Sequence, residues 1–511
     1  MSAALEDGFG ALKPAEKCGI IGIAGKENVA PNLYYGLRIL QHRGQESAGI
    51  ATFASGEVKT RRGMGLVHEV FSPDDLDALA GNAGIGHVRY STTGSSVVEN
   101  AQPISCQSVV GDVALAHNGD IVNAMDLREQ LQKKGWAFRS SSDSEVIVRL
   151  LANEIAQTGD VERAMKEFTN VLVGAYSLVL LIKDTVYAIR DPLAVRPLCI
   201  GELDGSYVVA SESVVFDTLG GKFLRDLKPG EVVRLREDGF DSFRLPHPSH
   251  AAHCMFEWVY FSRPDSVLDG RLVYDARVRI GQELAREHPV AADIVVPVPE
   301  SGRAQAQGYG KESGLPVIEG LIKNRYIERT FIMPEQTDRE ISVLLKLNPI
   351  RSAIKGKRIV LVDDSIVRGT TIKKIVRILR EQGGAKEVHL RIGCPPIRSP
   401  CYLGIDMKTR DQFIANGREV PEIQDFIGAD SLGYLSIRGL IQALKHPRED
   451  LCLGCLTGEY PIAVPGEKVR GVHRLEMFGD ARREPRTLDG AGSADGPGRK
   501  GRRRPAKKGI N

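Results

Sequence analysis

Short apolar runs alternate with glycine and aspartate turns from residue 18 to about residue 236. Runs of four to eight apolar or alternating residues are typical of buried or half-buried strands. Examples are CGIIGIAG, GIATFA, AGIGHVRY, DVALAHNG, AYSLVLLI, TVYAIRD, YVVAS and EVVRLR. Apolar residues at helical spacing predict helices near residues 32–40, 143–154 and 162–170. This part of the chain is therefore predicted to be a layered α+β domain.

The pattern changes from about residue 253 to residue 458. The runs ADIVVPVP and KRIVLVDDS are typical of buried parallel strands, and helical spacing follows in TTIKKIVRILREQ. This second part is predicted to be an α/β domain, joined to the first through RLPHPSHAAH at residues 244–253. Beyond residue 465 the chain becomes polar and rich in glycine, with 13 Lys and Arg against 6 Asp and Glu, a composition typical of a disordered basic tail.

Composition limits the class of protein. The 511 residues, 42% of them hydrophobic, suit two to four domains with full cores. Eight cysteines in a chain of this length do not form a disulfide scaffold. The acidic start of the chain does not resemble a secretory or transit signal, and no apolar run reaches the roughly 18 residues of a membrane span. We expect a cytoplasmic protein with no membrane partner.

The segment KRIVLVDDSIVRGTTIKK, residues 357–374, carries the clearest chemistry. A hydrophobic strand ends in Asp363 and Asp364, and a loop of small residues leads into a helix. Backbone N–H groups of such a loop and the helix N-terminus form an anion cradle, while two carboxylates suit ribose hydroxyls and Mg²⁺. A strand-end turn with capping residues is the simpler alternative for the small residues taken alone.

The whole segment resembles the 5-phosphoribosyl-1-pyrophosphate (PRPP) motif of the type I phosphoribosyltransferases. The resemblance implies that Asp363 and Asp364 contact ribose and Mg²⁺, with Ser301 as a further position for Mg²⁺. It also implies a set of PRPP-binding residues: Ser365, Ile366, Val367, Arg368, Gly369, Thr370, Thr371 and Lys346.

Five segments of the first part resemble the glutamine amidotransferases that use an N-terminal nucleophile. They are CGIIGI, QHRGQESAGI, GHVRYSTTG, LAHNGDI and SSSDSEV. In this order, and followed by the PRPP motif, they resemble the amidophosphoribosyltransferase family over about residues 18–465. The resemblance implies an α+β N-terminal-nucleophile (Ntn) hydrolase layered domain at residues 18–245, an α/β type I phosphoribosyltransferase domain at 253–465 and a basic tail at 466–511.

A cysteine directly before the first strand then has a chemical purpose. A thiol of ordinary pKa, about 8.5, is mostly protonated at neutral pH, whereas an α-amino group with a pKa of about 7.7–8.0 is a suitable base there. Removal of residues 1–17 as a propeptide would place nucleophile and base on Cys18. By resemblance, Asn118 and Gly119 stabilise the oxyanion, and the glutamine-binding residues are Arg89, Asp143, Arg43, Gly44 and Thr92. His42, His87 and His117 are expected to be structural.

Four cysteines are candidate metal ligands: Cys254, Cys401, Cys452 and Cys455. Spacing alone leaves structural zinc, an iron–sulfur cluster and a redox-active CxxC open. The family contains cluster-bearing members, and the resemblance implies a [4Fe–4S] cluster on these four, with a structural or stability-sensing role. Cys106, Cys199 and Cys394 are expected in the core.

One position departs from the family pattern. In the loop that closes over PRPP in relatives, Leu344 stands where arginine is usual, whereas Lys346 is kept. A cation there would stabilise the leaving pyrophosphate, so weakened transferase activity is an alternative. Lys323, Arg325 and Arg329 are candidates for contact with PRPP or a nucleotide effector.

The sequence therefore predicts an enzyme that makes 5-phosphoribosylamine from PRPP and glutamine-derived ammonia. By resemblance it needs Mg²⁺, is inhibited by purine nucleotides and forms a homotetramer, and no nucleic-acid partner is expected. A PRPP- or nucleotide-binding regulator, with the basic tail on nucleic acid, is one alternative. An amidotransferase acting on a different acceptor is another.

Overall fold

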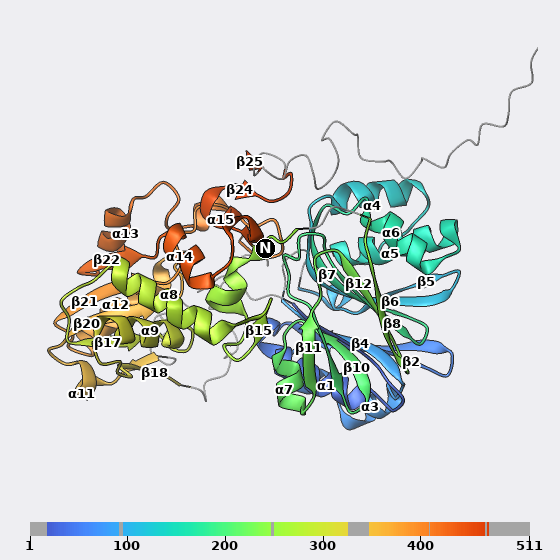
Figure 1. The fold of residues 1–511 in the computed structure, drawn as a ribbon, viewed down its shortest axis with the longest axis horizontal. Coiled ribbons are helices and arrows are strands. Elements are labelled where there is room, and N and C mark those ends of the chain that lie inside the picture. Colours follow the sequence, from blue (N-terminus) through green and yellow to red (C-terminus); the bar gives the residue numbers. More distant parts are fainter. Residues whose placement is uncertain are drawn as a thin grey trace, which may run out of the picture.

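The computed structural model describes residues 18–90, 96–246, 250–324, 347–407 and 409–464, and the backbone of 468–469. The proposed propeptide, Thr92, Arg325, Arg329, Leu344 and Lys346 lie outside these residues, as does nearly all of the basic tail. Two halves lie side by side, each with its own sheets and helices (Figure 1). No helix in the described ranges is both long and apolar enough to cross a membrane.

Two stacked antiparallel sheets form the N-terminal half. The first has seven strands in the order β11-β9-β10-β1-β4-β2-β3. Its strands in chain order are β1 (Gly19–Ala24), β2 (Ser47–Ala54), β3 (Glu57–Met64), β4 (Ala83–Arg89), β9 (Cys199–Leu203), β10 (Ser206–Ala210) and β11 (Lys222–Asp226). Central β1 is buried on both faces, because it pairs with β10 and β4 and lies between the second sheet and helices.

The second sheet has six strands in the order β13-β12-β8-β7-β6-β5. They are β5 (Ile104–Ser108), β6 (Gly111–Ile121), β7 (Gly174–Ile182), β8 (Thr185–Arg190), β12 (Glu231–Arg236) and β13 (Gly239–Arg244). Small and branched side chains such as Ala51, Ala114 and Val179 fill the space between the two sheets. Close-packed small residues let the sheets approach, so residues at the ends of β1 and β6 come near one another.

Helices cover the outer faces of both sheets (Figure 1). The seven-stranded sheet is covered by α1 (Ala30–Ile39), α2 (Val67–Val70), α3 (Pro73–Ala78) and α7 (Val214–Leu219). The six-stranded sheet is covered by α4 (Ala124–Lys133), α5 (Asp143–Thr158) and α6 (Val161–Thr169). The predicted layered α+β fold and its three predicted helices are confirmed.

The C-terminal half is built on a parallel sheet in the order β17-β20-β21-β22. The strands are β17 (Ile294–Pro297), β20 (Arg358–Asp363), β21 (Glu387–Ile392) and β22 (Ser431–Tyr434). One face packs on α8 (Val273–Glu287), α9 (Arg303–Ser313) and α14 (Ile437–Leu444), and the other on α12 (Thr370–Glu381) and α13 (Val420–Ile427). The predicted α/β fold of this half is also confirmed.

The remaining elements are short. Paired two-stranded elements are β14 (His253–Cys254) with β23 (Leu451–Cys452), β15 (Val267–Leu268) with β16 (Arg271–Leu272), β18 (Leu321–Lys323) with β19 (Leu347–Pro349), and β24 (Glu459–Tyr460) with β25 (Lys468–Val469). Short helices are α11 (Arg351–Ile354) and α15 (Gly454–Thr457), and single turns of other helix types are η1 (Leu40–Arg43), η2 (Val98–Asn100), η3 (Glu257–Phe261), η4 (Arg410–Gln412) and η5 (Arg448–Asp450).

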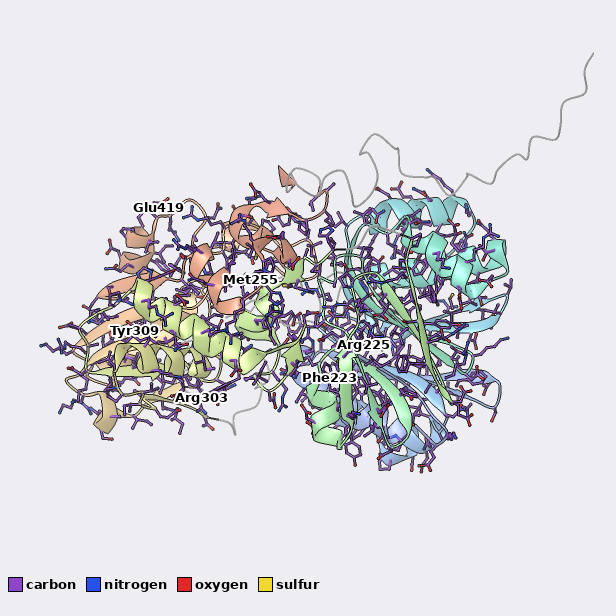
Figure 2. The ribbon with its side chains drawn as sticks, viewed as in Figure 1. Phe223, Arg225, Met255, Arg303, Tyr309 and Glu419 are labelled. Carbon is purple, nitrogen blue, oxygen red and sulfur yellow. The ribbon has the colours of Figure 1, made fainter. Side chains whose placement is uncertain are left out.

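The two halves are joined through backbone as well as side chains. The N–H of Ala252 donates to Leu193 O at 2.7 Å, and that of Cys254 donates to Val195 O at 3.1 Å. The start of the second half is therefore held against the loop between β8 and β9 of the first. Side chains fill the second half around Met255, the residue after Cys254 (Figure 2).

Candidate active sites

Cys18 lies at the buried front edge of β1. Its side chain is buried, and the Sγ atom is 3.8 Å from the carbonyl oxygen of Tyr90, just beyond β4. Because β1 pairs with β4 in register Gly19↔Val88, the end of β4 is brought beside the thiol. Cys18 is therefore buried against the end of β4, and its position is fixed by the pairing of β1 with β4.

Burial controls the protonation of this thiol. It raises the pKa of Cys18 to about 11, partly offset by the Tyr90 carbonyl contact and the positive charge of Arg89, while Asp143 and Glu46 add to the rise. These electrostatic neighbours show that Arg89 and Asp143, predicted to bind glutamine, lie near the nucleophile. At neutral pH the thiol is protonated, so an attack on glutamine requires a nearby base.

Asn118 presents an unpaired donor in the same half. It lies on β6, opposite Ser177 of β7, and its side chain is only 1% exposed. Its Nδ2 atom has no hydrogen-bond partner among the described residues. A buried amide donor without a partner costs free energy unless something else accepts its hydrogen. An oxyanion formed on a substrate would be such an acceptor.

Gly119 follows in a place where only glycine fits. A Cβ there would lie 1.9 Å from Ala175 O and 2.8 Å from His117 Nε2. The backbone of Gly119 is therefore held closely by its neighbours while remaining half-exposed.

Asp143 is the first residue of α5. It accepts a hydrogen bond from the Ile121 N–H at 3.2 Å, and His117 Nδ1 lies 3.7 Å from its Oδ2 atom. Burial alone would raise its pKa, but His117 and the backbone donors Ile121 and Ser144 bring the pKa below its ordinary value. The carboxylate is therefore charged at neutral pH. Sequence reasoning left His117 as structural and missed this contact.

Arg89 ends β4 and already has a partner. Its Nη1 atom lies 2.6 Å from Glu46 Oε1, and its side chain is buried. Gly44 lies against the same strand, since a Cβ would be 2.7 Å from the Arg89 backbone nitrogen. Gly44 therefore allows the turn after η1 to approach β4.

Arg43 lies beneath the nucleophile and contacts both halves. Its Nε donates to Cys18 O at 3.1 Å, Nη1 lies 2.5 Å from Glu212 Oε1, and Nη2 lies 3.0 Å from Glu257 Oε1. Glu212 belongs to the first half and Glu257 to the second, and all three side chains are buried. Arg196 adds a second buried cation, with its Nη1 atom 3.4 Å from Glu257 Oε1.

The predicted phosphate loop lies between β20 and α12 of the second half. Ser365 Oγ donates to Asp364 Oδ1 at 2.6 Å, and Gly369 has a φ of +75° at the start of α12. The Oγ1 atom of Thr371 is buried without a hydrogen-bond partner among the described residues. A left-handed glycine, a helix N-terminus and an unpaired hydroxyl together suit an anion.

Not every predicted PRPP-binding side chain points to that site. Ile366 and Val367 are buried in hydrophobic clusters, so only their backbone is available to a ligand. Arg368 donates to Gln412 Oε1 at 2.5 Å. Thr370, the first residue of α12, is exposed.

Ser301 belongs to the turn that follows β17, and the two carboxylates lie at the end of the neighbouring strand β20. β17 and β20 pair in parallel with Pro297 opposite Val362, so the turns that follow them are neighbours. A Cβ on Gly302 would lie 2.4 Å from Val362 O. No three His, Cys, Asp or Glu side chains in the described ranges converge on one metal point, which is compatible with Mg²⁺ held by one or two carboxylates and substrate phosphates.

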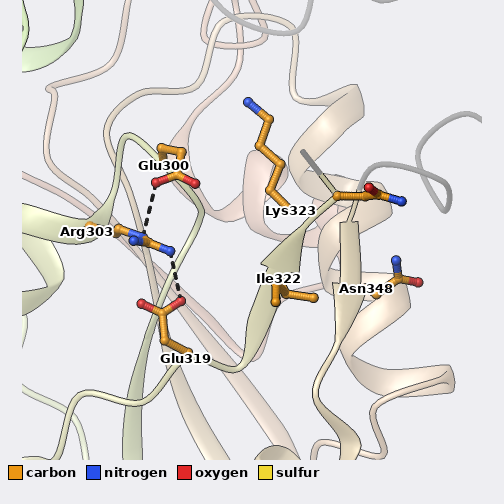
Figure 3. A pocket seen from close by; sticks show the side chains of 7 residues that line it. Glu300, Arg303, Glu319, Ile322, Lys323 and Asn348 are labelled. Atoms are coloured by element: carbon orange, nitrogen blue, oxygen red, sulfur yellow. Dashed lines mark hydrogen bonds and ion pairs between the residues drawn. The ribbon is translucent and has the colours of Figure 1, made fainter. Parts of the chain in front are cut away.

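A pocket of about 690 Å³ opens next to this turn (Figure 3). The Nε atom of Arg303 lies 3.4 Å from Glu300 Oε2, and its Nη2 atom lies 3.3 Å from Glu319 Oε2. Lys323 extends separately from β18. The lining residues are Glu300, Arg303, Glu319, Ile322, Lys323, Asn324 and Asn348.

The four candidate ligand cysteines come together from distant segments. Cys254 and Cys452 are opposite one another on β14 and β23, and Cys455 lies on α15. Burial raises the pKa of Cys455 well above its ordinary value, and the nearby thiols of Cys401, Cys452, Cys394 and Cys254 add to the rise. The backbone N–H of Leu403 points at Cys401 Sγ at 3.4 Å.

The arrangement is compatible with structural zinc and with an iron–sulfur cluster. Backbone N–H groups directed at sulfur stabilise thiolate ligands of such clusters. Cys106, Cys199 and Cys394 are buried in hydrophobic clusters, as predicted, and all eight cysteines are free of disulfides.

Two family models match the chain. A glutamine amidotransferase domain matches residues 87–218, and a phosphoribosyl transferase domain matches residues 265–394. The chain is 52% identical over 463 residues to an amidophosphoribosyltransferase of Methanothermobacter thermautotrophicus, covering 90% of this chain and 97% of the relative. It is 45% identical over 469 residues to that of Synechococcus elongatus, covering 91% and 95%.

Among solved structures, the chain is similar to glutamine phosphoribosylpyrophosphate (PRPP) amidotransferase from B. subtilis complexed with ADP and GMP. The TM-score is 0.82 and the identity 43%, over 88% of this chain and 99% of that one. A structure described as the allosteric regulatory enzyme of purine biosynthesis has a TM-score of 0.83 and 43% identity, over 88% and 98%.

Proposed function

The chain belongs to the amidophosphoribosyltransferase family, which performs the first step of purine biosynthesis, and we propose which residues of this chain perform that reaction. The enzyme joins a glutamine amidotransferase half to a phosphoribosyltransferase half. One half-reaction takes ammonia from glutamine, and the other transfers it to PRPP with loss of pyrophosphate.

In the first half-reaction, the Cys18 thiolate attacks the amide carbon of glutamine. The α-amino group freed by loss of residues 1–17 takes the thiol proton and later protonates the leaving ammonia. The unpaired Nδ2 of Asn118 supports its role as an oxyanion donor, together with the Gly119 N–H. Water then cleaves the thioester to glutamate.

Glutamine itself is held by two charges near Cys18. The lowered pKa of Asp143 supports a charged partner for the α-ammonium group. Arg89 would bind the carboxylate of glutamine, in competition with its present partner Glu46. Arg43 donates to the backbone carbonyl of Cys18, and Gly44 lets the turn after η1 approach Arg89. Thr92 lies outside the described residues and stays a prediction.

In the second half-reaction, the ammonia lone pair forms a bond to C1 of PRPP, the bond from C1 to pyrophosphate breaks, and a proton is lost. The loop from Ser365 to Thr371 would hold the 5′-phosphate, supported by the unpaired Thr371 hydroxyl. Asp363 and Asp364 would bind ribose hydroxyls, and with Ser301 would hold Mg²⁺, which neutralises pyrophosphate charge.

The finer properties are also proposals. Three buried cysteines, the partly exposed Cys452 and the Leu403 N–H directed at Cys401 support a [4Fe–4S] cluster, with a structural or stability-sensing role. The structurally similar B. subtilis protein is complexed with ADP and GMP, and the pocket beside Lys323 supports nucleotide inhibition here. Eight free cysteines support a reducing, cytoplasmic environment. The homotetramer rests on the family resemblance alone.

The single observation that carries the assignment of residues is the buried Asn118 donor without a partner among the described residues; it follows His117, which contacts Asp143, an electrostatic neighbour of Cys18. The test measures glutamate and pyrophosphate release by anaerobically purified protein, with and without Mg²⁺ and PRPP. We expect PRPP to stimulate glutamate release. The variant Cys18→Ala should make pyrophosphate from ammonium chloride but not from glutamine.

Other outcomes would separate the alternatives. Glutamate release that ignores PRPP, without pyrophosphate, would contradict the assigned PRPP loop. Slow pyrophosphate release even with saturating ammonium would instead favour weakened transfer through Leu344. If mass spectrometry shows residues 1–17 removed and glutamate is still absent, the assignment of Cys18 is wrong.

A further inference from the structure

The backbone of Gly404, in the second half, lies directly against Gly119 in the first. Gly404 has a φ of +98°, and a Cβ there would lie 2.8 Å from the Gly119 carbonyl carbon and 3.0 Å from its Cα. Contacts below 3.0 Å do not occur between real Cβ atoms and backbone without movement. Only glycine therefore allows this approach between the halves.

Three groups occupy the space that surrounds the Gly119 backbone. Ala175 O and His117 Nε2 belong to its own half, on β7 and β6, and Gly404 closes the side toward the second half. The first two are fixed by the register of the six-stranded sheet, in which Gly119 pairs opposite Tyr176. The third depends on how the two halves are joined.

A buried hydrogen bond fixes the turn that carries Gly404. Arg196 of the first half is fully buried, and its Nη2 donates to Leu403 O in the second half. The same Nη2 would lie 3.1 Å from a Cβ on Gly404. Arg196 also reaches Glu257, so its position is set by charge as well as by this hydrogen bond.

We propose that Gly404 is a positioning residue for glutamine hydrolysis: its bare backbone, held by Arg196, sets the place of the Gly119 N–H that stabilises the oxyanion. This inference rests on the proposed role of Gly119. The first half thus contains the nucleophile and the oxyanion donors, whereas Gly404, which positions the Gly119 donor, belongs to the second half. Displacements on the order of 1 Å in such sites cost about 10²-fold in rate.

The test compares Gly404→Ala with Gly428→Ala in anaerobically purified enzyme from which residues 1–17 have been removed, as checked by mass spectrometry. Gly428 also belongs to the second half and has a φ of +79°, but a Cβ there meets nothing within 4 Å, so it controls for backbone strain. For Gly404→Ala we expect the glutamine-dependent kcat to fall on the order of 10- to 100-fold. The KM for glutamine should change little, and ammonium-dependent pyrophosphate release should be kept.

Alkylation of Cys18 by iodoacetamide provides a separate readout. This reaction displaces iodide at a saturated carbon and forms no oxyanion, so its rate should be equal in Gly404→Ala and the unchanged enzyme. Equal losses in the glutamine- and ammonium-dependent rates would show a general folding defect and overturn the proposal. So would a glutamine-dependent kcat no lower than that of Gly428→Ala.

Arg196→Lys is a second test variant, to be used if Gly404→Ala does not fold. It keeps the positive charge beside Glu257 but loses the guanidinium fork that reaches Leu403 O. The same selective loss of glutamine-dependent kcat is expected, and its absence would contradict the proposal. Failure of the unchanged enzyme to hydrolyse glutamine, or full activity of Asn118→Ala, would instead contradict the proposed function itself.

Discussion

The Nε atom of Arg43 lies 3.1 Å from the carbonyl oxygen of Cys18, the residue that carries the nucleophile. The rest of the guanidinium is held by Glu212 from the same half and Glu257 from the other. A buried cation with two buried carboxylates is stable only while every partner stays in place. The backbone of the nucleophile is therefore tied to the junction of the two halves.

Glu257→Gln is expected to lower the melting temperature. The change removes one charge from the buried cluster and leaves Arg43 and Arg196 under-compensated, which costs about 3–5 kcal/mol. For domains of this size that corresponds to a fall of roughly 6–20 °C, measured by calorimetry. Glu312→Gln is the control, because its partner Arg286 is half-exposed and such surface pairs contribute little. Equal melting temperatures for the two variants would contradict the importance of the cluster.

Asn118→Ala should reduce glutamine hydrolysis by about 10²- to 10³-fold in kcat, because one oxyanion donor is lost. Removing an unpaired buried amide should not lower the melting temperature by more than a degree or two. Ammonium-dependent activity is the internal control, since it needs no oxyanion in the first half. A large rise in KM with unchanged kcat would assign Asn118 to ground-state binding.

The reactivity of Cys18 should depend on pH and on processing. Burial raises the thiol pKa to about 11 in the chain that still carries residues 1–17. Only the thiolate reacts with iodoacetamide, so below that pKa the rate should rise about tenfold per pH unit. Once Cys18 is the first residue, its α-amine should allow reaction near neutral pH. Peptide mass spectrometry follows the label, and identical pH profiles for the two forms would refute the assigned base.

Gly369→Ala should raise the KM for PRPP. The residue has a φ of +75°, which strains any side chain, and an added Cβ would lie 2.3 Å from Ile414 Cδ1, so the phosphate loop or the Ile414 side chain must shift. Gly356→Ala is the control, with a φ of +71° and open space around the Cβ. Steady-state kinetics with saturating ammonium isolates the effect from glutamine hydrolysis. Matching KM values in the two variants would show that the loop is not the phosphate site.

Cys401→Ser should lower the iron content of anaerobically purified protein and its visible absorbance, because a thiolate ligand is lost. Cys394→Ala is the control, since Cys394 is also buried in the same hydrophobic cluster but is assigned to the core. Intact protein should contain about four irons per chain if the cluster is [4Fe–4S]. Zinc in place of iron in the intact protein would favour the alternative of a structural zinc site.

The pattern of apolar residues was sufficient to predict the central strands of the sheets. β1, β7 and β20 are buried along nearly their full length, so their sequences are almost purely apolar. β3 was missed because its residues are largely exposed and polar, and its pairing with β2 is what holds it as a strand.

The site was predicted as far as its residues belong to sequence motifs. Contacts between residues that are far apart in the sequence could not be predicted. Glu212 and Glu257 are 169 and 214 residues from Arg43, and no local pattern marks a charge that will be buried with a distant partner. Glu46 lay within a quoted motif, yet nothing in the sequence indicated that it pairs with Arg89. Gly404 was missed because a lone glycine is ordinary in a turn.

The charge cluster between the halves also bears on how such a chain changes over time. A cut between β13 and β14 would leave Arg43 and Arg196 in one fragment and Glu257 in the other, so that Arg43 would keep only Glu212 and the contact of Arg196 with Glu257 would be lost. A recombination event that exchanged one half for that of a distant relative would have to bring matching charges with it. We therefore expect the two halves to be exchanged together, because the buried arginines of one half pair with a carboxylate of the other.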